Sequence, residues 1–274
     1  MTQQLIDADR ELKARHANMW AQGNYTAVAT EIIASLGPTL VQASGVRPEH
    51  RVLDVAAGAG NVAIPAALIG ADVVASDLTP ELLARGEQLA ADQGATLTWE
   101  EGDAEALPYG DSSFDVVLSC VGVMFAPNHQ AGADELVRVA RPGGTIGLIN
   151  WTPEGFIGQM FATMKPYTPP PPPGAQPPPL WGNEDHVVML LGDRVTSLAA
   201  RRQNLRVDAF RTPEEFREYF KTNYGPTISI YKANAGDPDK VAALDRDLAD
   251  LARRFTNRDG SLDWEYLLLT AVRS

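Results

Sequence analysis

The feature that most constrains the fold is a glycine-containing turn between a buried strand and a helix. Residues 51–55 have the apolar pattern of a strand, the turn occupies residues 56–60, and residues 62–69 have the composition of a helix. Glycine lets backbone amide groups approach a ligand closely, and the start of a helix carries partial positive charge. The segment therefore predicts a ligand-binding turn at the carboxyl end of a strand.

The alternation of strand and helix continues along the chain. A second strand over residues 72–76 ends at Asp77, and Thr79, Pro80 and Glu81 then supply an N-cap residue, a proline at the first helical position and an acid in the first turn. Such alternation predicts a parallel, doubly wound α/β sheet. Further strands are expected at residues 97–101, 115–119, 145–151, within 196–208 and at 265–272, and helices at residues 80–92, 130–140, 184–191, from Thr212 onward and at 238–255.

This pattern divides the chain into an N-terminal helical cover, a Rossmann-like core, a proline-rich insertion, and a final part with additional helices and a closing strand. We place these segments at residues 1–50, 51–151, 152–195 and 196–274, respectively. Within the cover, two amphipathic helices are expected over residues 3–16 and 26–44. Nine of the chain's 20 prolines lie between Pro166 and Pro179, where regular helix and sheet are excluded. This run is either a surface insertion or a semi-rigid flap beside a substrate entrance.

Composition restricts the classes of partner and compartment. The formal net charge of −12 argues against the basic surface that phosphate backbones require, so no nucleic-acid partner is expected. Cys120 is the single cysteine, which excludes an internal disulfide and a multi-cysteine metal site and fits a reducing cytoplasm. The charged residues 1–15 lack the apolar core of a signal peptide, and no run of about 18 apolar residues predicts a membrane span. We therefore expect a cytoplasmic protein with no metal centre and no membrane partner.

The glycine turn by itself fits two kinds of nucleotide ligand. Gly58, Gly60 and Ala63 match the G-x-G-x-x-G/A pattern of dinucleotide-binding enzymes, and Asp77 is placed to bind a ribose diol in either case. Asp54 favours a cationic ligand without phosphate over a dinucleotide, because its carboxylate would repel a pyrophosphate and attract a cation. S-adenosylmethionine (SAM) is such a ligand, since it carries a sulfonium and an ammonium group and no phosphate. In an alternative interpretation, Asp54 holds the amides of the turn without touching the ligand.

Three motifs give the chain a resemblance to a known family. The first is D-x-G-x-G-x-G over residues 54–60, in which Ala56 replaces the first glycine. The second is EGDAEALP at residues 101–108, followed by FDVV, and the third is ELVRVARPGG at residues 135–144. With these motifs the chain resembles the class I SAM-dependent methyltransferases, especially the ubiquinone/menaquinone-biosynthesis branch that acts on small molecules. The resemblance covers residues 20–151 and implies a seven-stranded Rossmann-like sheet whose last strand runs antiparallel.

The resemblance also implies which residues bind SAM. The expected set is Trp20, Tyr25, Asp54, Ala56, Gly58, Gly60, Asp77, Leu78, Asp103, Ala104 and Cys120. Asp77 would accept the ribose hydroxyls, and Asp103 with the next backbone amide would hold the adenine edge. Trp20 and Tyr25 would close over the methionine end, where aromatic faces suit a sulfonium; their alternative role is packing between cover and core. Cys120 is expected beside the cofactor as a small packing residue and not as a nucleophile.

Catalysis in such enzymes consists chiefly of aligning the nucleophilic atom of the acceptor with the methyl–sulfur bond. Some acceptors also need a base, and His129 and His186 are the candidates because they lie near the expected pocket. Each has an alternative role in packing or capping, and His16 and His50 are expected at the surface. The acceptor is expected between the cover, the ends of strands four and five and the insertion, where apolar and aromatic residues favour an aromatic or polycyclic molecule.

Two other functions remain open at this point. A nicotinamide-dependent oxidoreductase would need room for a pyrophosphate at residues 58–60. A non-catalytic or repurposed SAM-binding protein would share the fold and the cofactor, because neither of these fixes the chemistry. Binding of NAD would support the first, and SAM binding without methyl transfer would support the second. The residues do not select oxygen, nitrogen, carbon or sulfur as the methyl acceptor.

Overall fold

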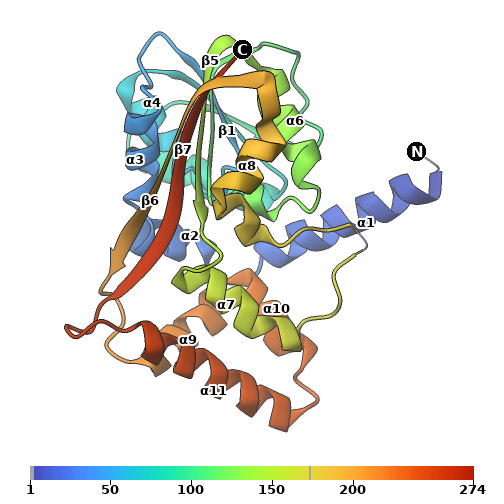
Figure 1. Cartoon of the computed structure of the whole chain (residues 1–274), viewed down its shortest axis with the longest axis vertical. Coiled ribbons are helices and arrows are strands. Elements are labelled where there is room, and N and C mark those ends of the chain that lie inside the picture. The colour runs from blue at the N-terminus through green and yellow to red at the C-terminus, as the bar shows by residue number, and fades with distance from the viewer. Residues whose placement is uncertain (1–2, 173) are drawn as a thin grey trace.

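The computed structural model describes residues 3–172 and 174–274, so Met1, Thr2 and Pro173 lie outside the described residues. Seven strands form one sheet in the order β3-β2-β1-β4-β5-β7-β6 (Figure 1). Strands β1 to β5 run parallel, and β7 pairs antiparallel with β5 and β6. The expected seven-stranded sheet is confirmed. Its strands are β1 (Arg51–Val55), β2 (Asp72–Asp77), β3 (Thr98–Glu101), β4 (Phe114–Cys120), β5 (Ala140–Trp151), β6 (Val195–Val207) and β7 (Leu262–Arg273).

The central strands are buried on both faces, as parallel strands between helices must be. Helices α3 (Leu36–Ala43) and α4 (Ala63–Ile69) lie on one side of the sheet, and α6 (His129–Val139) and α8 (Glu184–Leu191) lie on the other (Figure 1). Helix α5 (Pro80–Asp92) packs against β2 and β3. This doubly wound arrangement brings the carboxyl ends of β1, β2 and β4 together at one edge of the sheet, where the site described below is found.

The cover differs from the expected pair of helices. The first helix, α1 (Gln3–Trp20), is longer than predicted, and the predicted helix over residues 26–44 is broken. It consists of α2 (Tyr25–Ala27), a π-helical segment over Val28–Ile32, and α3. Pro38 explains the break, because a proline has no amide hydrogen and is tolerated only in the first turn, where α3 places it.

A second layer of helices lies below the sheet in Figure 1 and consists of α7 (Phe156–Met164), α9 (Pro213–Asn223), α10 (Gly225–Ala233) and α11 (Pro238–Phe255). Helix α11 packs against α7 and α9, and we call these four helices the cap. The Thr212 hydroxyl accepts a hydrogen bond from the Glu215 amide at 3.1 Å, which confirms the expected cap residue of α9. Helices α7 and α10 were not predicted, because α7 is apolar over most of its length and has no side-chain cap at its start, and α10 has only a weak amphipathic period.

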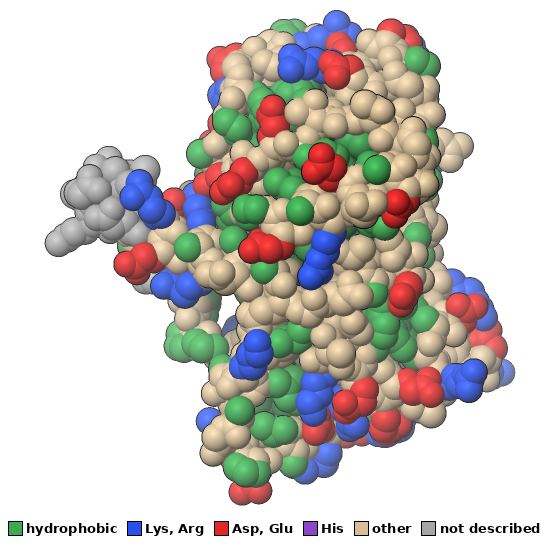
Figure 2. Space-filling view, turned by 180° about the vertical axis from the view of Figure 1, so that it is seen from behind, with side chains coloured by type: hydrophobic (Ala, Val, Ile, Leu, Met, Phe, Trp, Pro, Cys, Tyr) green, Lys and Arg blue, Asp and Glu red, His purple; other side chains and the backbone are tan. Residues whose placement is uncertain are grey.

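The proline-rich run connects α7 to α8 along the surface of the molecule. Residues 168–172 are mostly exposed, whereas Pro179 and Trp181 are buried. The amide of Gln176 donates a hydrogen bond to the carbonyl of Pro127 at 3.1 Å, which fastens the run beside the loop after β4. On the face shown in Figure 2, acidic and basic side chains are interspersed. Among the described residues, none of the helices combines the length and apolar character needed to cross a membrane.

Candidate functional site

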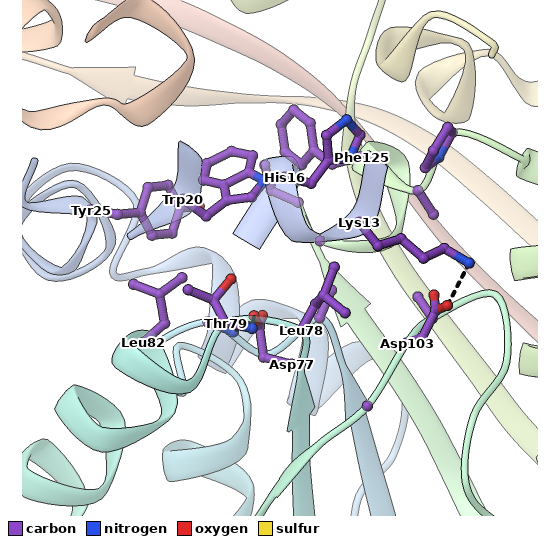
Figure 3. A pocket seen from close by; sticks show the side chains of 18 residues that line it. Lys13, His16, Trp20, Tyr25, Asp77, Leu78, Thr79, Leu82, Asp103 and Phe125 are labelled. Carbon is purple, nitrogen blue, oxygen red and sulfur yellow. Dashed lines mark hydrogen bonds and ion pairs between the residues drawn. The ribbon is translucent and has the colours of Figure 1, made fainter. Parts of the chain in front are cut away.

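A cavity lies at the carboxyl ends of β1, β2 and β4, beneath the carboxyl-terminal half of α1 (Figure 3). It encloses about 680 Å³, including its open mouth, and all of its lining residues come from positions 13–127. Eight of the eleven predicted cofactor residues line it, namely Trp20, Tyr25, Ala56, Gly58, Asp77, Leu78, Asp103 and Ala104. The structure therefore brings most of the predicted set together around one space, which we call the cofactor cavity.

The glycine turn has the backbone conformation that its sequence favours. Gly58 and Gly60 have φ angles of 56° and 85°, in the left-handed region that only glycine adopts without strain. Ala56 has φ 55°, so the alanine that replaces the first glycine of the motif occupies a conformation that costs about 1 kcal/mol. Gly60 does not line the cavity. A Cβ atom there would lie 2.6 Å from the Trp99 ring, so this glycine is required by packing beneath the turn.

Asp54 lies beneath the turn and not in the cofactor cavity. Its Oδ2 accepts a hydrogen bond from the amide of Ala63 at 3.0 Å, at the start of α4. The residue is 1% exposed, and burial raises the pKa of its carboxyl to about 8 despite that hydrogen bond. This geometry favours the alternative role, in which Asp54 fixes the turn and the helix start without touching the ligand.

Asp77 ends β2 with its carboxylate at the floor of the cavity (Figure 3). One oxygen accepts the amide hydrogen of Gly58 and the other accepts that of Thr79, each at 2.8 Å. Burial raises the pKa of this carboxyl, while the amide hydrogen bonds act in the opposite direction. The Thr79 hydroxyl and the Leu78 amide also act as hydrogen-bond donors that lower this pKa, so a ribose hydroxyl would share the carboxylate with them. Asp77 thus holds the turn and can also bind a ligand.

Asp103 lies at the opposite end of the cavity from Tyr25 in Figure 3. Its Oδ1 accepts the amide hydrogen of Glu105, and its Oδ2 lies 2.5 Å from Nζ of Lys13 on α1. Lys13 also contacts Asp9 at 2.8 Å and Glu105 at 3.2 Å. Burial alone would lower the pKa of Lys13, but its hydrogen bonds to Asp103 and Asp9 raise it above its ordinary value.

Aromatic rings form the wall of the cavity opposite Asp77. The ring of Trp20 lies 5.2 Å from that of Tyr25 and 4.6 Å from that of Phe125, with edge-to-face geometry. His16 also lines the cavity, which corrects its expected place at the surface. His16 lies one helical turn before Trp20 and shares its face of α1. This spacing could therefore have predicted that His16 lines the same cavity as Trp20. Burial lowers the pKa of His16 and favours its neutral form.

Comparison with known proteins agrees with this geometry. A methyltransferase domain model matches residues 53–148. The uncharacterized protein Rv1405c of Mycobacterium tuberculosis is 55% identical over 266 residues, which cover 97% of this chain and 96% of that protein. A demethylmenaquinone methyltransferase of Beutenbergia cavernae is 37% identical over 132 residues, which cover 45% of this chain and 53% of that enzyme. The chain belongs to the class I SAM-dependent methyltransferases.

Solved structures share the fold of this methyltransferase. The YcgJ protein of Bacillus subtilis aligns with a TM-score of 0.58 and 18% identity, covering 86% of this chain and 97% of that one. The cyclase SpnF aligns with a TM-score of 0.53 and 17% identity, covering 88% of this chain and 80% of that one. At this level of identity both similarities concern the fold alone. The assignment of the site rests instead on the match to the methyltransferase domain and on the geometry of the cavity.

Cys120 and its neighbour Val121 lie where β4 ends in this methyltransferase. Cys120 is half-buried, does not line the cofactor cavity, and has a thiol pKa that burial raises, as expected for a packing residue and not for a nucleophile. Val121 lines the cavity with φ 54°, which is strained for a branched side chain. Its place in the lining was not predicted, because a valine in the sequence gives no indication of a left-handed backbone conformation.

The two candidate bases, His129 and His186, contact each other outside the cofactor cavity. Nδ1 of His129 lies 2.9 Å from Nε2 of His186, and the His129 ring packs 5.6 Å from that of Trp181. His129 is fully buried, and burial together with the neighbouring His186 lowers its pKa to about 4. Neither histidine lines the cavity, so this arrangement favours the packing role that the sequence left open.

Proposed function

We propose that this methyltransferase acts on a small, uncharged acceptor of apolar or aromatic character. The observation that carries the proposal is the roof of the cofactor cavity, where α1 contributes Lys13, His16 and Trp20. A helix fastened across the cavity favours a small acceptor over a macromolecular one beside the cofactor. The ring of Phe125 and the branched side chain of Val121 line the same cavity, and both favour an apolar molecule.

We further propose how the cavity holds SAM. Asp77 accepts the ribose hydroxyls, and Asp103 and the amide of Ala104 hold the adenine edge. Trp20 and Tyr25 face the sulfonium, whose attraction to aromatic rings is about 0.5–2 kcal/mol. Bound SAM would supply an electrophilic methyl group for a nucleophilic atom of the acceptor, with its sulfur as the leaving group, and any acceptor proton would pass to water.

Alignment of the acceptor is the main catalytic contribution in this proposal. A role for His129 or His186 as general base would require a rearrangement that brings an imidazole to the cavity. We also expect a cytoplasmic location and no nucleic-acid partner, on the grounds of the single cysteine and the net charge of −12.

The test compares ligand binding with turnover. Calorimetry should detect binding of SAM and of its demethylated product, S-adenosylhomocysteine, and no binding of NAD. Incubation with SAM and a panel of small aromatic compounds should release S-adenosylhomocysteine. The fold also occurs in the cyclase SpnF, so SAM binding without methyl transfer to any acceptor would favour a repurposed SAM-binding protein. Tight NAD binding without SAM binding would overturn the cofactor assignment.

A further inference from the structure

The turn that follows α1 meets the cap backbone to backbone. The amide of Asn24 donates a hydrogen bond to the carbonyl of Asn223 at 3.2 Å, where α9 ends. Gly23 has φ 70°, and a Cβ atom there would lie 2.8 Å from the same carbonyl oxygen. A side chain at position 23 would therefore separate the two segments, so this glycine is required for their close approach.

A second glycine serves the same contact from the side of the cap. Gly225 begins α10 and is buried. A Cβ atom there would overlap the carbonyl oxygen of Met19 and lie 3.5 Å from Cα of Trp20. Alanine is the more favourable residue in a helix, so the glycine serves the approach of α10 to the end of α1 and not the conformation of α10.

Polar side chains fasten the same turn to α10. The side-chain amide of Gln22 donates a hydrogen bond to the Ser229 hydroxyl at 3.3 Å, and its oxygen accepts one from Nζ of Lys232 at 2.8 Å. Ser229 and Lys232 are three residues apart in α10 and therefore share one face of that helix. The turn after α1 is thus held to the cap at several points, consistent with the packing of α1 on α10 (Figure 1).

One side chain of the cap carries this contact to the wall of the cofactor cavity. Tyr224 lies between α9 and α10 and is 5% exposed. Its ring lies 5.7 Å from that of Trp20 and 6.3 Å from that of Tyr25. Trp20 and Tyr25 line the cofactor cavity, whereas Tyr224 and Gly225 do not. The cap therefore contacts the rings of the cavity wall from outside the cavity.

We propose that the cap junction, residues 223–225, positions the aromatic wall of the cofactor cavity, so that Tyr224 and Gly225 set the position of Trp20 and Tyr25 without contacting the ligand. This rests on the proposed function, in which those two rings face the sulfonium of SAM. Packed interiors transmit small displacements, so a shift of the junction moves the rings. The junction therefore affects the methionine end of SAM more than its adenosyl end.

The test compares SAM with adenosine, which shares the adenosyl part of SAM and lacks the methionine part. In the proposed function Asp77 and Asp103 of the core hold the adenosyl part, so adenosine reports on that end of the cavity. Calorimetry measures SAM directly and adenosine by its competition with SAM. Gly225→Ala should weaken SAM about 3–10-fold and adenosine less than about twofold, because the attraction between an aromatic ring and a sulfonium depends on their placement.

Gly236→Ala is the matched control. Gly236 lies between α10 and α11, and a Cβ atom there would have no atom within 4 Å among the described residues, so the variant should bind both ligands as the parent does. Tyr224→Leu and Tyr224→Phe provide second variants if Gly225→Ala folds poorly. Leucine removes the ring that contacts Trp20 and should weaken SAM alone, whereas phenylalanine keeps the ring and should retain the affinity of the parent.

The outcomes separate this inference from the proposed function. A parent protein that fails to bind SAM, or that binds SAM without competition from adenosine, contradicts the proposed function, in which the core holds the adenosyl part. If the parent binds both ligands and folded Gly225→Ala retains its SAM affinity, or loses affinity for both ligands equally, the junction does not position the wall while the cofactor assignment stands. Tyr224→Leu with parental SAM affinity, or Tyr224→Phe as weak as Tyr224→Leu, overturns the inference as well.

Discussion

Nζ of Lys13 lies 2.5 Å from a carboxylate oxygen of Asp103, and this ion pair fastens α1 to the loop that follows β3 (Figure 3). Both side chains are largely buried, with 14% and 24% of their surface exposed, so the pair is less screened than a surface ion pair. Because α1 also carries His16 and Trp20 into the cavity, the ion pair links the position of a helix to the shape of the ligand site.

We expect Lys13→Met to weaken SAM binding about fivefold, because the roof helix loses its contacts with Asp103 and Glu105. Calorimetry at low and high salt measures this, and the salt dependence of the parent should diminish in the variant. Arg15→Met is the control, since Arg15 pairs with Glu11 on the same helix at 3.9 Å with both side chains exposed. Equal SAM affinity in parent and Lys13→Met would show that the pair does not hold the roof.

Asp77→Asn should weaken SAM binding at least about tenfold while leaving the fold intact. Asparagine keeps the shape and one oxygen, which can accept from only one of the Gly58 and Thr79 amides, whereas alanine would release both. Asp72→Asn, at the exposed start of the same strand, should have no effect. The affinity is measured by calorimetry and the fold by circular dichroism. A folded Asp77→Asn protein with parental affinity would exclude the ribose role.

Asp54 should make the free energy of unfolding fall as the pH rises from about 4 to about 8. Its pKa is about 8 in the folded protein, against about 3.9 in an unfolded chain, so the folded state binds more protons across this window. Asp54→Asn removes the titration and keeps an oxygen that can accept from the Ala63 amide. Denaturant unfolding at several pH values should show a shallower decline in the variant. Identical slopes would mean that Asp54 is ionised in the folded protein.

His129→Ala and His186→Ala should lower the melting temperature more than they lower turnover. The two rings contact each other beneath Trp181, so each deletion leaves a cavity or an unpaired ring nitrogen. Turnover per folded molecule is measured between pH 6 and 9 with the acceptor found in the panel. A general base contributes about 10²–10⁴-fold, so a loss of that size without loss of stability would restore the base assignment.

Much of the core could be predicted from sequence, because its signals are local. The bounds of α5 follow from Pro80 after Thr79, and those of α11 follow from a clean amphipathic repeat. The same holds for the turn and for Asp77 at a strand end. Helix α7 had a weaker signal, because the segment is apolar over most of its length and Gly155 at its start supplies no side-chain cap.

The site was predictable only where one segment determines the geometry. Motif residues of the turn and of β2 line the cavity, but Lys13 reaches it through an ion pair with a residue 90 positions later. Trp264 packs against Trp151 at the end of β5 because β7 pairs with β5, a long-range contact that no local pattern reports. The sequence placed His129 and His186 near the expected pocket, but in the structure their rings contact each other and neither lines the cavity.

The position of β7 between β5 and β6 has a consequence for the order in which the protein assembles. In the sheet, β6 contacts only β7, which is separated from it in sequence by α9, α10 and α11. The cofactor cavity is lined by residues from positions 13–127, whereas α9, α10, α11 and β7 follow Thr212 in the sequence. During synthesis on the ribosome, the residues that line this cavity therefore emerge well before the strand that completes the sheet.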